Sequence, residues 1–278
     1  SFNNNTGTLT LIANPPTATS GWTDGKLNGA LSFDGSNDYI DMTNTSAVAD
    51  DLTNMSVSFW LKTSSQGGIF KQIVGKFNNN VSGPGWALDI MGSGSSAVGK
   101  ITFYAKDSGG TYAQIRTQGT YFDNTWHHIV LVKSGNSGTN FKFYIDGINL
   151  AVDNLSSGTP SSFSNSENIK FAVKGDLASY FYGQIDEVRI YDRAISATEV
   201  MALYKGSKAT VVNKTDTSRL TNGLVGYWTF DGKNMYGTSA LDISGNNNTG
   251  TLTNGPTAVI GKLGQALSFD GTDDYVNS

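Results

Sequence analysis

The stretch TWHHIVLVKSGNSGTNFKFYIDGINLA, residues 125–151, decides the class of fold. Its first half contains the apolar run IVLV at 129–132, which predicts a buried central strand. Its second half has two runs rich in aromatic and β-branched residues on either side of Asp146-Gly147, a dipeptide typical of a two-residue hairpin turn. The stretch therefore predicts antiparallel strands.

Short apolar runs between clusters of Gly, Asn and Ser recur on both sides of this stretch. They include SVSFWLKT (56–63), GWALDIM (85–91), KITFYAK (100–106), YAQIRTQ (112–118) and YGQIDEVRIYDRAIS (182–196). Glycine accounts for 33 of 278 residues and only 15% of residues are charged, which favours many turns and few helices. One short helix is predicted over 196–206, because Ser196 and Glu199 have capping-box spacing. We expect an all-β antiparallel sandwich with this one helix at its C-terminal end.

Composition excludes several classes of function. The net charge is −4 and no basic run occurs, so nucleic acid is not an expected partner. No apolar stretch of about 18 residues is present, so membrane insertion is not expected. The chain has no cysteine, which excludes disulfides and a thiol nucleophile. The two histidines, His127 and His128, are neighbours on a predicted strand, where their side chains point to opposite faces, so we expect structural roles.

Two segments of the sequence recur far apart. NNNTGTLT occurs at 3–10 and 246–253, and GKLNGALSFDGSNDY at 25–39 returns as GKLGQALSFDGTDDY at 261–275. A repeat with so long a period indicates tandem domains. We therefore expect a domain over 1–206 that lacks its own first strand, and a linker over 207–222. Residues 223–278 would be the N-terminal part of a second repeat, which completes the first domain or that of a neighbouring chain.

The order of the motifs resembles a known family. GLVGYWTFDG (223–232), SVSFWLK, TWHHIVLVK, FKFYIDG and GQIDEVRIYDRAISATEV together resemble the laminin-G-like branch of the concanavalin A-like lectin/glucanase superfamily. The resemblance implies a jelly-roll β-sandwich of two antiparallel sheets. The same fold carries lectins, adhesins, spacers and enzymes, so the function is a separate hypothesis. Our first hypothesis is a non-catalytic extracellular module that acts in adhesion or glycan binding, with a glycan or a cell-surface protein as its partner.

The resemblance also implies calcium as a cofactor, at the junction of the N-terminal segment with the final strand. Oxygen donors stand at the matching positions, and Ca²⁺ prefers such carboxylate and amide ligands. They are Asp186, Asp231, Asp242 and Asn246. For Asp231 and Asp242 the alternative is turn formation without a metal, because Asp and Asn favour turns.

Aromatic and amide side chains in predicted loops are the candidate sugar ligands. They are Trp22, Trp86, Asn79, Asn80 and Tyr112. Catalysis is not expected, because a retaining glycosidase needs two carboxyl groups about 5 Å apart on one face. The nearest candidates, Asp186 and Glu187, are neighbours that a regular strand would point to opposite faces.

A second hypothesis has a structural function. Tandem domains of this kind can act as spacers, or as subunits of a filament in which chains exchange strands, and the partner is then another copy of the chain. A third hypothesis is an accessory module of a hydrolase. The surface composition, rich in Asn, Thr and Gly with few charges, favours a secreted or cell-surface location.

Overall fold

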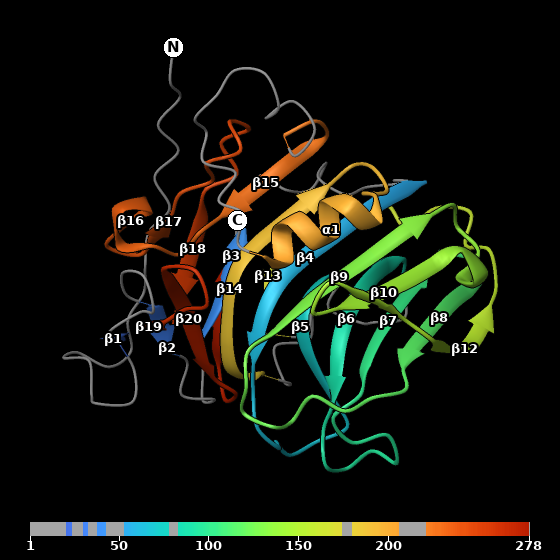
Figure 1. The fold of residues 1–278 in the computed structure, drawn as a ribbon, viewed down its shortest axis with the longest axis horizontal. Coiled ribbons are helices and arrows are strands. Elements are labelled where there is room, and N and C mark those ends of the chain that lie inside the picture. The colour runs from blue at the N-terminus through green and yellow to red at the C-terminus, as the bar shows by residue number, and fades with distance from the viewer. Residues whose placement is uncertain are drawn as a thin grey trace.

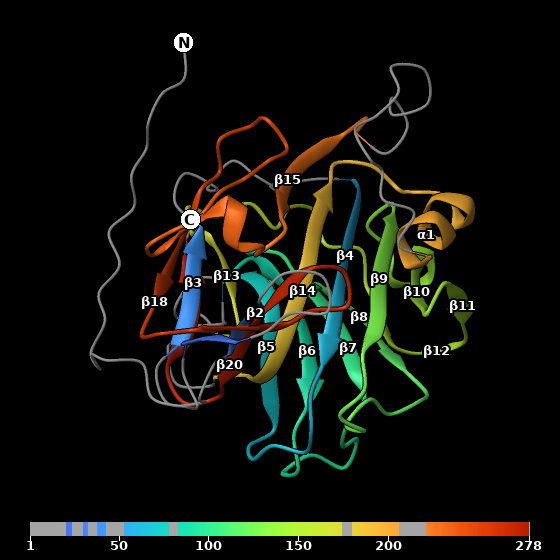
Figure 2. The same cartoon turned by 60° about the vertical axis from the view of Figure 1, so that its left-hand side comes forward.

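The computed structural model describes residues 53–77, 83–173, 180–205 and 221–277, together with three short strands at 21–23, 30–32 and 38–42. These residues form two β-sheets that lie face to face, with one α-helix on the outside (Figures 1 and 2). The expected antiparallel jelly-roll sandwich is confirmed.

The first sheet, called here the β14 sheet, has ten strands among the described residues. In spatial order they are β1 (Gly21–Thr23), β2 (Ala30–Ser32), β19 (Thr257–Ile260), β20 (Gln265–Asp270), β14 (Tyr182–Tyr191), β4 (Asn54–Lys62), β9 (His127–Ser134), β10 (Phe141–Ile145) and β11 (Ile148–Leu150), with β15 (Leu224–Trp228) paired to β14.

The second sheet, called here the β6 sheet, has eleven strands in the same part of the chain. Their order is β12 (Val152–Ser157), β8 (Tyr112–Thr117), β7 (Ile101–Lys106), β6 (Gly85–Met91), β5 (Phe70–Phe77), β13 (Ile169–Phe171), β21 (Asp274–Asn277), β3 (Asp38–Met42), β18 (Gly250–Thr253), β17 (Ser239–Ala240) and β16 (Met235–Tyr236). Two 3₁₀ turns, η1 (Gly138–Asn140) and η2 (Gly232–Asn234), complete the described elements.

The core lies between the two sheets. Alternate residues of each strand point inward, so Phe59 and Leu131 of the β14 sheet and Leu88 and Phe103 of the β6 sheet are completely buried in one hydrophobic cluster. The hairpin predicted at Asp146-Gly147 is confirmed between β10 and β11. Its two turn residues have φ values of 53° and 81°, as a turn with left-handed backbone requires.

The predicted helix is also confirmed, as α1 (Ala197–Tyr204). Ser196 caps it, and the Glu199 side chain accepts a hydrogen bond from the Ser196 backbone N–H at 2.7 Å, which completes the capping box. Val200 and Leu203 of α1 pack with a second buried cluster that includes Tyr144 of β10. The helix therefore covers the outer face of the β14 sheet (Figure 2).

Residues 221–277 contribute strands to both sheets. β15 pairs with β14, and the Trp228 side chain at the end of β15 packs edge-on against Phe171 of the β6 sheet, with ring centroids 6.0 Å apart. β20 also pairs with β14, whereas β18 and β21 lie in the β6 sheet. The division into a domain, a linker and a partial repeat stays a prediction, and residues 206–220 lie outside the described part of the chain.

One strand departs from the predicted alternation. β14 has a β-bulge, because Asp186 is opposite Trp60 and Arg189 is opposite Ser58, which leaves two residues of β14 against one of β4. Glu187 has a φ of 53° at this bulge. The expectation that Asp186 and Glu187 point to opposite faces of a regular strand is therefore wrong here, and both side chains are buried.

Within the part of the chain that the structure describes, no helix combines the length and the apolar character needed to cross a membrane.

Candidate functional site

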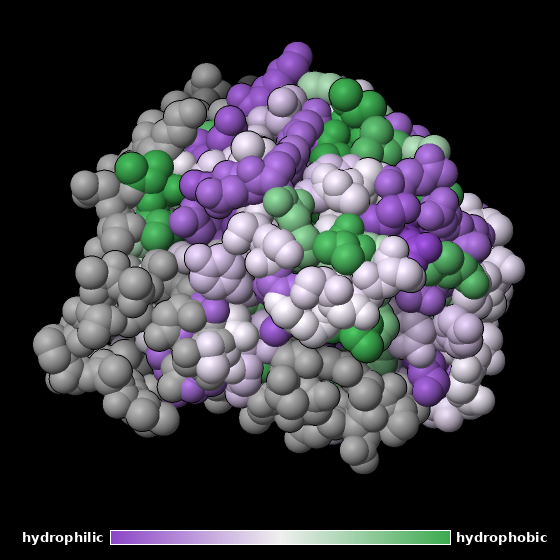
Figure 3. Space-filling model, turned by 90° about the horizontal axis from the view of Figure 1, so that it is seen from below, coloured by the Kyte–Doolittle hydropathy of each residue, from purple (hydrophilic) through white to green (hydrophobic). Residues whose placement is uncertain are grey.

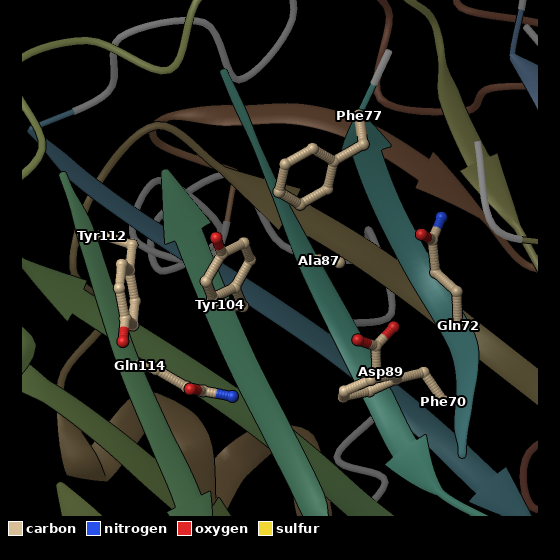
Figure 4. Close-up of a pocket in the computed structure, with 8 residues that line it drawn as sticks. All are labelled: Phe70, Gln72, Phe77, Ala87, Asp89, Tyr104, Tyr112 and Gln114. Atoms are coloured by element: carbon tan, nitrogen blue, oxygen red, sulfur yellow. The ribbon is translucent and has the colours of Figure 1, made fainter. Parts of the chain in front are cut away.

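A hollow lies on the outer face of the β6 sheet, on the side away from the core. Alternation along the strands creates it: Trp86 and Leu88 of β6 point into the core, whereas Ala87 and Asp89 point outward. The hollow has a volume of about 390 Å³. Four neighbouring strands supply its lining (Figure 4), which consists of Phe70, Gln72, Phe77, Ala87, Asp89, Tyr104, Tyr112 and Gln114.

Residues with short side chains form part of the floor of this hollow and leave open space above the sheet. Gly75, Ala87, Tyr104 and Gln114 are register partners across β5, β6, β7 and β8, so they form one row across the sheet. Two members of this row have no side chain or only a methyl group. The larger side chains of neighbouring rows therefore rise around an open space that is wide enough for a small ligand.

Three aromatic rings form one wall of the hollow. The Phe77 and Tyr104 rings are stacked, with centroids 5.7 Å apart and planes at 21°, and the Tyr104 and Tyr112 rings follow at 5.5 Å and 42°. Phe77 is buried at one end, whereas Tyr112 is 41% exposed at the other. Burial, followed by the neighbouring Tyr112, raises the pKa of the Tyr104 phenol, so Tyr104 keeps its proton and can donate a hydrogen bond at neutral pH.

Figure 4 shows Gln72, Asp89 and Gln114 below the row of three rings, with the Phe70 ring beside Asp89. Gln72 and Gln114 each offer an amide donor and a carbonyl acceptor, and Asp89 adds a carboxylate acceptor. None of the eight lining residues is a lysine, an arginine or a histidine. The arrangement can bind a ligand that presents both an apolar face and several hydroxyl groups.

The structure separates the five ligand residues expected from the sequence. Tyr112 lies in the hollow. The prediction for Trp86 is wrong, because register turns its side chain into the core, where it is completely buried and packs near Phe103. Trp22 falls in strand β1, and its side chain is outside the described part of the structure. Asn79 and Asn80 also lie outside the described residues.

Sequence reasoning missed Phe77 and Tyr104, the two rings that join Tyr112 into a continuous wall. The available signal was the alternation within KITFYAK, where Tyr104 has the opposite phase to Ile101 and Phe103. Alternation alone assigns a face to each residue. The position of Tyr104 beside Phe77 depends on the pairing of β5, β6 and β7, which the sequence does not state.

A second candidate site lies where β14, the end of β15 and the turn before β20 meet. Asp186 and Asp231 both face this turn: the Leu263 N–H donates to Asp186 Oδ2 at 3.4 Å, and the Gln265 N–H donates to Asp231 Oδ1 at 2.7 Å. A Cβ atom added at Gly261 would collide with the Asp186 carboxylate, and one at Gly264 would collide with that of Asp231. The two glycines of the GKLG segment at 261–264 thus form a cradle around two carboxylates.

The two carboxylates of this cradle differ in their partners. Asp231 has a cation nearby, since Lys233 Nζ lies 3.9 Å from its Oδ2. Asp186 has no exposed surface, and its Oδ1 has no hydrogen-bond partner among the described residues. Burial raises the pKa of the Asp186 carboxyl well above its usual range, and the nearby Glu187 and Asp231 raise it further. A buried carboxylate oxygen that lacks a donor, beside a second carboxylate, fits a bound cation such as calcium.

The other two residues of the expected calcium set are placed differently. Asp242 Oδ1 accepts hydrogen bonds from the N–H groups of Tyr227 and Ser244 at 2.9 and 2.8 Å, and its Oδ2 accepts one from the Asn248 N–H at 3.0 Å. The Asn246 amide donates to the Leu224 carbonyl at 3.0 Å. Asp242 and Asn246 therefore stabilise the loop beside β15, which is the turn role considered for Asp242.

The expected four-residue arrangement is not found as a single cluster. Within the described residues, the only three acidic side chains whose oxygens come within 4.8 Å of one another are Asp270, Asp273 and Asp274. These belong to the turn between β20 and β21, where Asp270 Oδ1 accepts from the Thr272 N–H at 2.8 Å and Asp274 Oδ2 from the Asp270 N–H at 2.9 Å.

The two histidines have structural environments, as predicted. The His127 ring lies between Asp146 and Asp123, at 2.8 and 3.0 Å, and the hydrogen bond with Asp146 is the main reason why its pKa is raised. His128 is buried on the opposite face, where its ring is 2.9 Å from the Ser58 hydroxyl. Burial lowers the pKa of His128 to about 3, so this ring is neutral at physiological pH.

The face of the molecule seen in Figure 3 is mostly polar. Its hydrophobic residues, coloured green, form separate small groups between hydrophilic and intermediate residues. This distribution is typical of an exposed surface and does not mark a broad apolar docking area on that face.

The comparison with protein-family models agrees with the fold. A family model described as the concanavalin A-like lectin/glucanase superfamily matches residues 34–201, which is more than half of the chain. No curated protein sequence matches the chain. Among solved structures, the CBM40 module of Ruminococcus gnavus IT-sialidase has 16% identity and a TM-score of 0.49, over 64% of this chain and 96% of that chain. Domain 4 of AbnA, an extracellular GH43 arabinanase from Geobacillus stearothermophilus, has 17% identity and a TM-score of 0.45, over 68% and 82%.

Proposed function

Because the chain belongs to the concanavalin A-like lectin/glucanase superfamily, we propose that it is a non-catalytic, extracellular glycan-binding module with the hollow on β5–β8 as its ligand site. This fold carries binding modules and enzymes alike, so the residues of the site must support the choice. The observation that carries the proposal is the wall of Phe77, Tyr104 and Tyr112 facing two glutamine amides and one carboxylate.

The wall and the polar groups match the two surfaces of a sugar. A pyranose or furanose ring has an apolar face of C–H groups, which would stack on the exposed ring of Tyr112 and contact the partly buried ring of Tyr104. Its hydroxyl groups point sideways, toward the amides of Gln72 and Gln114 and the Asp89 carboxylate. An aromatic lining with a few placed polar groups is the usual composition of a small-molecule site.

Binding without hydrolysis follows from the acid–base groups of the hollow. Glycoside hydrolysis uses a pair of carboxyl groups on either side of the scissile bond. Asp89 is the one carboxyl group among the eight lining residues. The buried Asp186 and Asp231 accept hydrogen bonds from the turn at 261–265 and are not among the lining residues, so they do not supply a second carboxyl group to the hollow.

We assign calcium to the cradle of Asp186 and Asp231, as a structural cation. It would neutralise two carboxylates that join β14, the end of β15 and the turn before β20. The module would then depend on calcium for stability rather than for contact with the sugar. A secreted or cell-surface location agrees with such a role, because extracellular calcium is abundant, and glycan binding there would serve adhesion.

The test is binding of neutral oligosaccharides, first on a glycan array and then by calorimetry with the best ligand. We expect Tyr104→Ala and Tyr112→Ala to weaken binding about tenfold or more each, which corresponds to about 1.4 kcal/mol for a lost stacking surface. Tyr182→Ala is the matched control, because Tyr182 is a similarly exposed tyrosine on the β14 sheet. Binding that survives both hollow variants, or that Tyr182→Ala weakens equally, would overturn the assignment of the site.

A further inference from the structure

Two strands with nearly the same sequence have the same pairing partners. β3 contains DYIDM (38–42) and β21 lies in DYVNS (274–278). Ile40 of β3 and Val276 of β21 are both register partners of Leu252 in β18. On the other side, Asp41 and Asn277 are both register partners of Lys170 in β13. The two strands run parallel to each other, and every pair is separated by the 236 residues of the repeat, as in Tyr39 with Tyr275.

The strands that precede β3 and β21 in the two copies, β2 and β20, show the same relation in the β14 sheet. Leu31 of β2 and Leu267 of β20 are both register partners of Ala258 in β19, and they are again 236 residues apart. The coincidence therefore involves both sheets and two separate strands of each copy.

A strand has only two hydrogen-bonding edges. A strand between β13 and β18 uses one edge for each, and neighbouring strands lie about 4.8 Å apart, so one position cannot hold two strands at once. β3 and β21 each pair with β13 and with β18. They are therefore alternative occupants of one position, called here the strand slot.

The apolar side chains that β20 and β21 bury have counterparts in both copies of the repeat. Leu267, Phe269, Tyr275 and Val276 of the second copy are buried. The first copy has Leu31, Phe33, Tyr39 and Ile40 at the corresponding places, so three of the four are identical and the fourth adds one methylene group.

We propose that the strand slot is an exchangeable binding site for the repeated segment, which either copy fills within one chain and which accepts the same segment from a second copy of the chain. Antiparallel addition to β13 and β18 gives the affinity, and the apolar positions give the specificity. A segment of the same chain has an effective concentration in the millimolar range, so it outcompetes a second chain until both of its own copies are disabled. This inference does not depend on glycan binding.

Proline substitutions test exchange within the full-length chain, because proline removes a backbone donor and disrupts a strand. The variants are Ile40→Pro, Val276→Pro and the double variant. We expect the double variant to lower the melting temperature by at least twice the sum of the two single shifts, because each single variant keeps one competent copy. Additive shifts would overturn the proposal.

Hydrogen exchange gives a result that does not require the double variant to fold. In Val276→Pro, amide protection should be lost at 272–278 and gained at 38–42, and Ile40→Pro should leave protection at 272–278. Unchanged exchange at 38–42 in Val276→Pro would contradict a shared slot.

A peptide tests addition from outside the chain. A synthetic peptide of residues 264–278, added at millimolar concentration, should raise the melting temperature of the double variant. The matched control is the same peptide with Val276→Pro, which should have no effect. If the two peptides act alike, or if neither acts on a folded double variant, the slot does not accept a second copy.

Discussion

Trp228→Ala tests whether residues 221–277 are an integral part of the sandwich. Trp228 has no exposed surface, packs edge-on against Phe171 of the opposite sheet, and donates from its indole Nε1 to the Asn248 carbonyl at 2.7 Å. Truncation of a buried tryptophan costs about 3–5 kcal/mol, a range that includes the lost aromatic pair. It also leaves the Asn248 carbonyl without this donor. We expect a loss of about 4 kcal/mol in the free energy of unfolding.

This loss should appear as a fall of about 8–16 °C in the melting temperature, at about 2–4 °C per kcal/mol for a domain of this size. Differential scanning calorimetry measures it and also shows whether there is one transition. The opening sequence GLVGYW occurs once in the chain, so no second copy can replace Trp228. Tyr236→Ala is the control within the same segment, because Tyr236 is 68% exposed and its loss should cost less than about 0.5 kcal/mol.

An unchanged main transition in Trp228→Ala would refute the reasoning. The reasoning would also be refuted if Trp228→Ala removed a separate small transition and left the midpoint of the main transition unchanged. Either result would mean that β15 and its tryptophan add to the sandwich without sharing its cooperative unfolding.

Two further predictions concern the buried titratable groups His128 and Asp186. His128 has a folded pKa of about 3 against about 6.5 when unfolded, so the unfolded chain binds the additional proton and His128 costs about 1.4 kcal/mol of stability per pH unit as the pH drops through this window. The raised pKa of Asp186 acts in the opposite direction, but equally in the wild type and in His128→Gln. In urea unfolding, the stability of the wild type relative to His128→Gln should therefore fall by about 1.4 kcal/mol per pH unit from about pH 6 to about pH 4, and a constant difference would contradict the prediction. Millimolar CaCl₂ should raise the melting temperature of the wild type. Asp186→Asn should abolish this calcium-induced rise. Asp242→Asn should lower the melting temperature but leave the calcium-induced rise unchanged. A melting temperature that is insensitive to both calcium and chelator would remove calcium from the cradle.

Local signals in the sequence predicted the parts of the fold that are held by local interactions. The hairpin at Asp146-Gly147 and the capping box of Ser196 and Glu199 each depend on residues within a few positions of one another, and both were recognisable. The bulge at Glu187 was not, because it arises from the pairing of β14 with β4 and leaves no turn residue in the sequence.

The candidate site was predictable only in part, for a related reason. Tyr112 follows a glycine-rich turn, so its exposure could be inferred. Trp86 stands beside Gly85 and Pro84, which resembles a loop, yet it has the inward phase of β6 and is buried. The carboxylates show the same limit: Asp186 and Asp231 meet through long-range pairing, whereas Asp242 bonds to its own loop.

The cradle also predicts that the two copies of the repeat are not equivalent in the strand slot. The second copy reads GKLG and has Gly264 against the Asp231 carboxylate, with a φ of 87° and no room for a Cβ atom. The first copy reads GKLN and has Asn28 at the corresponding place. An asparagine tolerates positive φ better than most residues, yet it still carries the Cβ atom that would collide with Asp231.

The second copy should therefore be the preferred occupant, and Gly264→Asn should remove its advantage. We expect this variant to lower amide protection at 272–278 and to raise it at 38–42 in hydrogen exchange, because the two copies then share the slot. Thr272→Ser is the matched control, since it also changes the second copy to the residue of the first, but at an exposed turn position where nothing collides. If Gly264→Asn and Thr272→Ser give the same protection pattern, the carboxylate cradle does not decide which copy fills the slot. If Gly264→Asn alone shifts protection toward 38–42, then one glycine beside one buried carboxylate decides which of two nearly identical strands fills the slot.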